Sequence, residues 1–147
     1  MQVQPYLMFD GRCEEALEFY RKALGAEVKM LMHVKDAPDP NIPMPADKVL
    51  HACLQIGDTQ VMASDGHCSG APEFRGFSLA LTAADDADAK RRFAALADGG
   101  NIKMPLAKTF FASSFGMVDD RFGVSWMVTV PAEQPAVDPR SKEKTHA

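Results

Sequence analysis

Side chains with the chemistry for catalysis or metal binding are few in this chain and widely spaced. Its four histidines include no pair with the H-x3-H or H-E-x-x-H spacing of a metal site. His67 and Cys68 follow Asp65 closely, but three mixed donors in one short segment are a weak metal signal. The candidates for acid–base or hydrogen-bond chemistry are His51, Asp65 and Asp120. The ordinary alternatives stay open: a strand histidine satisfied by backbone groups, and a carboxylate that stabilises a turn.

A second set of candidates is aromatic or carries hydroxyl groups. Five of the twelve aromatic residues lie between positions 110 and 126. Alternation over 124–130 puts Trp126 and three valines on one face of a strand, expected in the core, and Ser125, Met127 and Thr129 on the other. The mixed faces are expected to line a cleft, with core packing as the alternative for most of their residues. The candidate ligand-binding residues are Tyr6, Ser64, Ser78, Phe111, Phe115, Ser125 and Met127.

Cys13 is a weaker candidate. It begins a predicted helix, where the helix dipole can lower the pKa of a thiol. Neither His nor Asp adjoins it in the sequence, so a nucleophilic role has little support. The charge run at 90–92 belongs to a predicted helix and is expected to be a solvated face.

The elements that must position these residues follow from hydrophobic periodicity. In the first half, strands are predicted at 2–9, 27–34, 49–56 and 59–64, and an amphipathic helix at 13–24. Residues 36–48 contain four prolines and are predicted to be a surface loop, as are residues 65–76. In the second half, a helix is predicted at 85–97, with strands at 77–82, from 102, at 110–118 and at 124–130. Phe77, Leu79 and Leu81 are expected to pack under a helix.

The two halves repeat one pattern. Leu7 aligns with Leu79 at a shift of 72 residues, Tyr20 with Phe93 at 73, and Gly25 with Gly99 at 74. One half is too small to bury both faces of its sheet. The sequence therefore predicts an α+β fold: two βαβββ modules that form an eight-stranded curved mixed sheet, with helices outside and a concave cleft. We expect one domain over 1–130, with modules at about 1–66 and 76–130, and a disordered tail over 131–147.

Composition excludes several classes of protein. The formal net charge is −4 and the sequence pI is about 5.5, which argues against binding to nucleic acid or an anionic membrane. No apolar run approaches the roughly 18 residues of a membrane span, and no signal peptide is evident. Three cysteines at wide spacing fit a reducing cytoplasm better than a disulfide framework.

Ordered blocks of residues resemble the vicinal oxygen chelate superfamily, which includes glyoxalase I, extradiol dioxygenases and the bleomycin and fosfomycin resistance proteins. The closest resemblance is to its bacterial PhnB-like branch, whose members often bear the name 3-demethylubiquinone-9 3-methyltransferase. It covers about residues 3–130. The blocks are Pro5-Tyr6-Leu7, 11–16 with Phe19-Tyr20, His51-Ala52, 56–58, 62–65, 114–116 and 120–126.

The resemblance implies a metal that this chain lacks the ligands to hold. The superfamily's metalloenzymes use His and Glu from four cleft-facing strands, and the matching positions here are Pro5, residues 60–64, Ser78 and Met127. None is an acid or an imidazole, so we expect no divalent metal and no other cofactor. Methyl transfer is not supported either, because no glycine-rich loop follows a strand to form a nucleotide site.

Three functions remain open from the sequence. The first is a cytoplasmic homodimer that binds an apolar or aromatic small molecule without turnover, as the bleomycin-resistance relatives do. The second is a PhnB-like enzyme of unknown substrate that uses His51, Asp65 or Asp120. The third is a partner-binding protein that uses the proline-rich loop 36–48.

Overall fold

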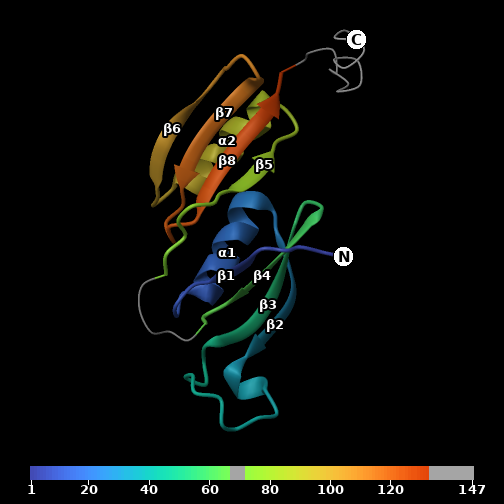
Figure 1. Ribbon diagram of the computed structural model, residues 1–147, viewed down its shortest axis with the longest axis vertical. Helices are drawn as coiled ribbons and strands as arrows, with labels where there is room; N and C mark the ends of the chain where they lie inside the picture. The colour runs from blue at the N-terminus through green and yellow to red at the C-terminus, as the bar shows by residue number, and fades with distance from the viewer. Residues whose placement is uncertain (67–71, 133–147) are drawn as a thin grey trace, which may run out of the picture.

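The computed structural model describes residues 1–66 and 72–132, which form two modules placed one after the other along the long axis (Figure 1). The first module contains β1 (Tyr6–Met8), α1 (Cys13–Leu24), β2 (Glu27–His33), the short 3-10 helix η1 (Val34–Asp36), β3 (Val49–Ile56) and β4 (Thr59–Ser64). The second contains β5 (Leu79–Thr82), α2 (Asp86–Ala97), β6 (Asn101–Ala107), β7 (Ala112–Asp119) and β8 (Ser125–Pro131). The predicted α+β class and the two βαβββ modules are confirmed.

The strand order is the same in both modules. The first has the order β1-β4-β3-β2 and the second β5-β8-β7-β6. In each, the first strand pairs in parallel with the last, and the other pairs are antiparallel. The eight strands thus form two four-stranded mixed sheets, here called sheet A and sheet B, rather than one continuous sheet. Strands β1 and β5 are edge strands, because β1 pairs only with β4 and β5 only with β8.

The predicted boundaries hold for α1, β3 and β4 and shift elsewhere. Strand β1 begins only after Pro5. Strand β6 runs through Pro105, which an edge strand tolerates. Strand β7 begins at Ala112, so Phe111 precedes it, and β8 extends to Pro131, the first residue of the predicted tail. The rest of that tail, from 133, and residues 67–71 of the predicted loop lie outside the described residues.

The helices are amphipathic, and their starts are stabilised in different ways. In α2, the Asp85 carboxylate accepts a hydrogen bond from the Asp88 backbone N–H at 2.7 Å, an ordinary N-cap. In α1, Arg12 holds the N-cap position and makes no side-chain capping bond. Helix α1 ends at Gly25, whose φ of 66° is left-handed and suits glycine.

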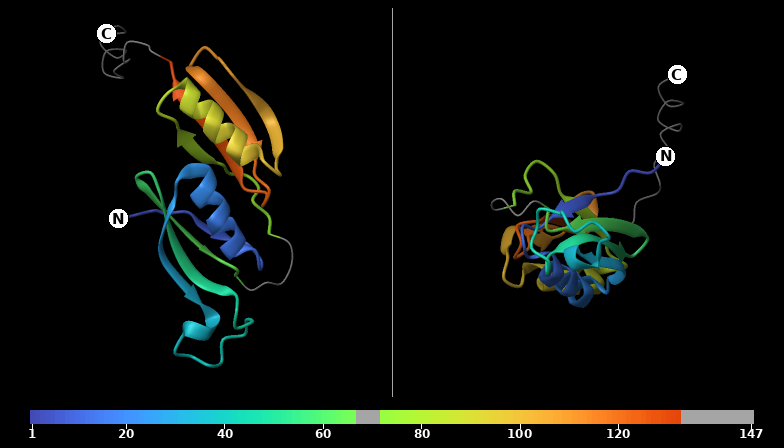
Figure 2. Two further views of the ribbon diagram at one scale, coloured as in Figure 1. Left: turned by 180° about the vertical axis from the view of Figure 1, so that it is seen from behind. Right: turned by 90° about the horizontal axis from the view of Figure 1, so that it is seen from below.

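The core is continuous through both modules. Helix α2 covers one face of sheet B, as Figure 2 shows from behind, and α1 packs on sheet A. At the junction, the Tyr20 and Trp126 rings lie 5.6 Å apart and the Phe9 and Phe122 rings 5.8 Å apart. Trp126 is buried, as expected. The expectation for Phe77 is wrong: it precedes β5, is 45% exposed and contacts only the ring of Phe74 among the aromatic residues described.

Within the described part of the chain, neither helix combines the length and the apolar character that crossing a membrane requires.

Candidate functional site

Each sheet has one face that its helix does not cover, here called the open face. In sheet A, register pairing places Met30, Cys53, Met62 and Tyr6 in one row across β2, β3, β4 and β1. Residues paired across strands project from the same face, and so do residues two positions apart on one strand. His51 therefore shares the open face with Cys53. Beside this row, Glu27, Gln55 and Gln60 form a polar row across β2, β3 and β4.

The main polar feature of the sheet A open face is a pair formed by Tyr6 and His51. The Tyr6 hydroxyl lies 3.1 Å from His51 Nδ1, within hydrogen-bond distance. The two rings are tilted by 33° with their centroids 5.6 Å apart. Because β4 lies between β1 and β3, this contact reaches across a strand. The pair can orient a polar group of a ligand, and it can pass a proton between a phenol and an imidazole.

The open face of sheet B has a similar make-up. Met104, Met117, Met127 and Ala80 form a row across β6, β7, β8 and β5. Met104 and Met30 are related by the internal repeat at a shift of 74 residues. The two methionine rows are therefore in corresponding places of the two modules.

Hydroxyl and aromatic groups border this second methionine row. Ser78 and Ser125 share a hydrogen bond of 2.7 Å between their Oγ atoms. Phe115 pairs with Thr129 on the open face. The Phe111 ring, one residue before β7, lies 5.1 Å from the Phe115 ring. The structure thus gathers five of the predicted ligand-binding residues, Ser78, Phe111, Phe115, Ser125 and Met127, on or beside sheet B.

Ser64 lies at the end of β4 and is engaged locally. Its side chain is buried, and its Oγ accepts a hydrogen bond from the Gly66 backbone N–H at 3.0 Å. Of the predicted ligand-binding residues, it is the one least available to a ligand.

Asp65 directly follows β4 and is buried among backbone donors. Its Oδ1 accepts hydrogen bonds from the N–H groups of Gly11 and Cys13, both at 2.8 Å. Its Oδ2 accepts one from Val49 N–H at 2.7 Å. Cys13 is the first residue of α1, and the N-cap residue Arg12 makes no side-chain bond to the helix. The Asp65 carboxylate, which follows β4, therefore provides the negative charge at the start of α1. The structure therefore gives Asp65 a role in holding α1, β3 and β4 together.

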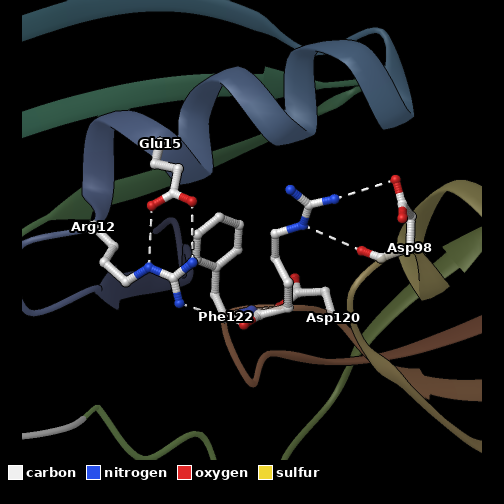
Figure 3. A network of polar contacts seen from close by, with 6 residues as sticks. Arg12, Glu15, Asp98, Asp120 and Phe122 are labelled. Atoms are coloured by element: carbon white, nitrogen blue, oxygen red, sulfur yellow. Dashed lines mark hydrogen bonds and ion pairs between the residues drawn. The ribbon is translucent and has the colours of Figure 1, made fainter.

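Asp120 lies in the β7–β8 turn and is buried at the junction of the modules (Figure 3). Its Oδ2 accepts hydrogen bonds from the Tyr20 hydroxyl at 2.5 Å and from Trp126 Nε1 at 2.9 Å. Its Oδ1 accepts from the backbone N–H groups of Phe122 and Val124 at 2.9 and 3.1 Å. Burial raises the pKa of Asp120, and these four donors act in the opposite direction. It holds α1 of one module to the turn of the other.

Two arginines cover this junction from the outside. The Arg12 guanidinium lies 4.5 Å from the centre of the Phe122 ring and pairs with Glu15. Arg121 lies 4.5 Å from the centre of the Phe19 ring and pairs with Asp98. Such cation–ring contacts shield the aromatic core from water. The surroundings of Asp120 are thus those of a packed interface. Of the three predicted catalytic candidates, His51 alone lies on an open face, and the structure does not bring the three together.

The residues that the resemblance matches to metal-ligand positions carry side chains that do not suit a divalent ion. The Pro5 carbonyl accepts a hydrogen bond from Met62 N–H at 2.9 Å, and proline has no donor side chain. Residues 60–64, Ser78 and Met127 bring no carboxylate or imidazole. Elsewhere in 1–66 and 72–132, no three side chains of His, Cys, Asp or Glu are placed to hold a metal ion.

The two described cysteines differ in environment. Cys13 is fully buried, and burial raises the pKa of its thiol, with the charges of Asp65 and Glu14 acting in the same direction. The helix dipole therefore does not lower the pKa of this thiol, because desolvation outweighs it. Cys53 is free and partly exposed on the sheet A open face.

Alkylation is expected to distinguish these thiols. In the native protein, iodoacetamide should modify Cys53 and should react with Cys13 more slowly by roughly a hundredfold or more, because Cys13 is both inaccessible and protonated. Peptide mass spectrometry over a time course measures both rates. In denaturant the two rates should become similar. Equal rates in the native protein would contradict the buried position of Cys13.

Sequence reasoning missed part of the candidate site, namely Met30, Cys53 and Met62. The available signal was alternation: Cys53 is two residues from His51, and Met62 is two residues from Ser64, both already candidates. What alternation cannot provide is the register that sets the three sulfur atoms in one row.

Comparison with known proteins places this geometry in a family. The family described as 3-demethylubiquinone-9 3-methyltransferase matches residues 1–129. Protein YjdN of Escherichia coli (strain K12) is 36% identical over 146 residues, covering 92% of this chain and 99% of YjdN.

Solved structures agree with this placement. Protein PA1353 from Pseudomonas aeruginosa is 42% identical, with a TM-score of 0.80, covering 89% of this chain and 98% of its own. A putative 3-demethylubiquinone-9 3-methyltransferase, the PhnB protein from Bacillus cereus, is 29% identical, with a TM-score of 0.76, covering 88% and 99%. Fosfomycin-resistance and glyoxalase/bleomycin-resistance structures share the fold at lower identity. The chain therefore belongs to the 3-demethylubiquinone-9 3-methyltransferase family, and it shares its fold with fosfomycin-resistance and glyoxalase/bleomycin-resistance structures.

Proposed function

We propose that this protein is a cytoplasmic small-molecule binding protein that works as a homodimer and holds an apolar or aromatic ligand between open sheet faces. The observation that carries this proposal is the pair of matching open faces. In a single chain both expose large apolar side chains: Met8 is 53% exposed, Met104 46% and Phe111 47%. Apolar surface of this kind marks sites of ligand or partner binding.

A second copy of the chain is the occupant that fits these faces. One copy's sheet A face presents the row that contains Met30 and Met62, and the other's sheet B face presents the row that contains Met104, Met117 and Met127. Packing the first against the second covers both and encloses a space lined by methionine and aromatic side chains. Flexible thioether side chains adapt to ligands of different shape. The proposed cleft is thus formed between subunits.

Polar groups within this lining can orient the ligand. The Tyr6–His51 pair lies on one open face and the Ser78–Ser125 pair on the other. A few placed donors and acceptors in an apolar lining are the usual composition of a small-molecule site. We therefore expect the ligand to be mainly apolar, with one or two hydroxyl, carbonyl or amine groups.

Divalent-metal chemistry and methyl transfer are not part of the proposal. The positions matched to the superfamily's metal ligands carry side chains that do not bind hard cations, such as Pro5 and Met127. In the described sheets, each helix connects the first strand of its module to an edge strand on the far side, unlike the glycine-rich βαβ unit that holds a nucleotide cofactor. Free Cys13 and Cys53 thiols fit a reducing cytoplasm.

Native mass spectrometry of the full chain, followed by ligand screening, tests this function. We expect a dimer that carries a noncovalent organic adduct, and an aromatic or amphiphilic ligand that raises the melting temperature by about 10 °C at a hundredfold excess over its Kd. The substitution Met127→Glu should abolish this shift, because it places a charge in the apolar lining. Lys90→Glu, on the exposed side of α2, is the matched control and should leave the shift unchanged.

Two results would count against the proposal. One is a monomer without adduct and without stabilisation by any ligand of a broad aromatic and amphiphilic panel. The other is a ligand shift that survives Met127→Glu, which would place the site elsewhere.

A second candidate function is an enzyme of this branch that uses His51. The observation in its favour is the Tyr6 contact at His51 Nδ1, which orients the imidazole on the open face. Asp65 and Asp120 have less support in such a role, because both are buried and hydrogen bonded to backbone groups. With a copurified ligand identified, turnover that His51→Ala abolishes while binding persists would favour the enzyme over the binding protein.

A further inference from the structure

The sheet A open face has a thiol between two thioethers, a combination that binding an apolar ligand does not require. Met30 pairs with Cys53, and Cys53 pairs with Met62, so three sulfur-bearing side chains stand side by side on three adjacent strands. Side chains paired in this way have their Cβ atoms about 4.5–5.5 Å apart. None of the three is fully buried, and Met30 is 40% exposed. Flexible thioethers on both sides of a thiol can converge on one small ion.

An imidazole completes the set. His51 lies two residues before Cys53 on β3 and shares its face. Its Nδ1 contacts the Tyr6 hydroxyl at 3.1 Å, and no partner of Nε2 occurs among the described residues. A hydrogen-bonding partner on one ring nitrogen orients the ring and leaves the other nitrogen to bind a metal.

The chemistry of these donors selects a particular class of ion. Thiolate and thioether sulfur prefer soft cations such as Cu(I), whereas Mg²⁺, Ca²⁺ and Mn²⁺ prefer carboxylate and carbonyl oxygen. No carboxylate belongs to the row itself or to Met32 and His51 on one side of it. On the other side Glu27 pairs with Gln55, and the Glu27 carboxylate is engaged by Lys29 at 2.6 Å. We propose that Cys53, Met62, Met30 and His51 form a binding site for a soft monovalent cation of the Cu(I) class.

The single positive charge of the cation is balanced by the negative charge of one ligand. The Cys53 thiol releases its proton to solvent and bonds to the cation as a thiolate, and the thioethers and imidazole bind as neutral donors. No oxidation or reduction takes place.

Sheet B contains a natural comparison. Its row of Met104, Met117 and Met127 has thioethers where sheet A has Met30, Cys53 and Met62. It has no thiol, and no imidazole lies two residues from its central position, since Phe115 and Asp119 flank Met117 at that distance. A thioether-only row should bind the cation far more weakly. This comparison separates a specific site from general affinity of methionine for soft metals.

The test is an anaerobic competition for Cu(I) between the reduced full chain and a chromophoric Cu(I) chelator. A Cys68→Ser background is used throughout, because Cys68 lies outside the described residues. We expect one tightly bound Cu(I) per chain. Cys53→Ser should weaken binding by roughly a hundredfold or more, and Met62→Leu and His51→Gln by about tenfold each, in keeping with the usual cost of losing a ligand or its support.

Met44→Leu is the matched control, since it removes a methionine from the loop before β3, outside both sheets, without changing shape, and it should leave Cu(I) affinity unchanged. Circular dichroism verifies that each variant is folded. X-ray absorption of the Cu(I) form should show sulfur together with nitrogen neighbours. Unchanged affinity in Cys53→Ser, or equal losses in Met62→Leu and Met44→Leu, would overturn the proposal. Because the probe is the metal alone, the result does not depend on whether the protein binds an organic ligand.

Discussion

Replacing Asp120 by asparagine is expected to lower the free energy of unfolding by about 3–5 kcal/mol, the usual cost of breaking a buried, hydrogen-bonded charged group. The carboxylate accepts four hydrogen bonds, two at each oxygen. An asparagine keeps one acceptor oxygen and turns an N–H₂ group toward two former donors. The Tyr20 hydroxyl can rotate to accept, but Trp126 Nε1–H and the backbone N–H groups cannot. At least one buried donor is therefore left without a partner.

Equilibrium denaturation in urea, followed by tryptophan fluorescence and by circular dichroism, measures this loss. Trp126 reports directly, because its indole N–H is one of the four donors. Tyr20→Phe removes a single bond to the same carboxylate and should cost about 1–2 kcal/mol. Asp119→Asn is the matched control one residue away, since its only ion pair is with exposed Lys103 at 3.6 Å among the described residues, and it should cost less than about 0.5 kcal/mol. A loss for Asp120→Asn no larger than for Asp119→Asn would show that the network contributes little.

The part of the fold that the sequence predicts is the part set by local periodicity. Helix α1 and strands β3 and β4 have their predicted bounds, because amphipathic spacing and the Gly57-Asp58 turn are encoded within each segment. The internal repeat also predicted the topology, because two segments with the same pattern of elements fold with the same strand order. The division into two four-stranded sheets was not predictable in this way, because it depends on which edges of β1 and β5 remain unpaired.

The candidate site shows the same limit. Tyr6 and His51 were both candidates, but their contact joins residues 45 positions apart, across a strand whose register no local pattern reveals. A register shift between Val28 and Met30 decides that Met30, and not its neighbour, pairs with Cys53. Asp65 and Asp120 were candidates for chemistry because of residue type alone. Their partners, as distant as 54 and 100 positions, show that a buried carboxylate can serve the fold instead.

Asp65 should be the second residue whose loss is costly. Asp65→Asn is expected to lower the free energy of unfolding by about 2–4 kcal/mol, because the amide presents a donor to at least one backbone N–H that the carboxylate now satisfies. The negative charge is lost as well. It lies at the first turn of α1, where Arg12 makes no capping bond and where an anion stabilises the helix dipole. One side chain thus supports the starts of α1 and β3 together with the loop at Gly11.

The comparison with the other helix makes this prediction specific. Asp85→Ala removes the N-cap of α2, an exposed interaction within one turn, and should cost about 1 kcal/mol. Hydrogen exchange then locates the effect of each change. In Asp65→Asn, the amides of Gly11, Cys13 and Val49 should lose protection together, although Val49 is 38 positions from Gly11 along the chain, because one carboxylate holds all three. If Asp65→Asn cost no more than Asp85→Ala, or if only the α1 amides lost protection, Asp65 would be a local cap and not a tie between α1 and the central strands of sheet A.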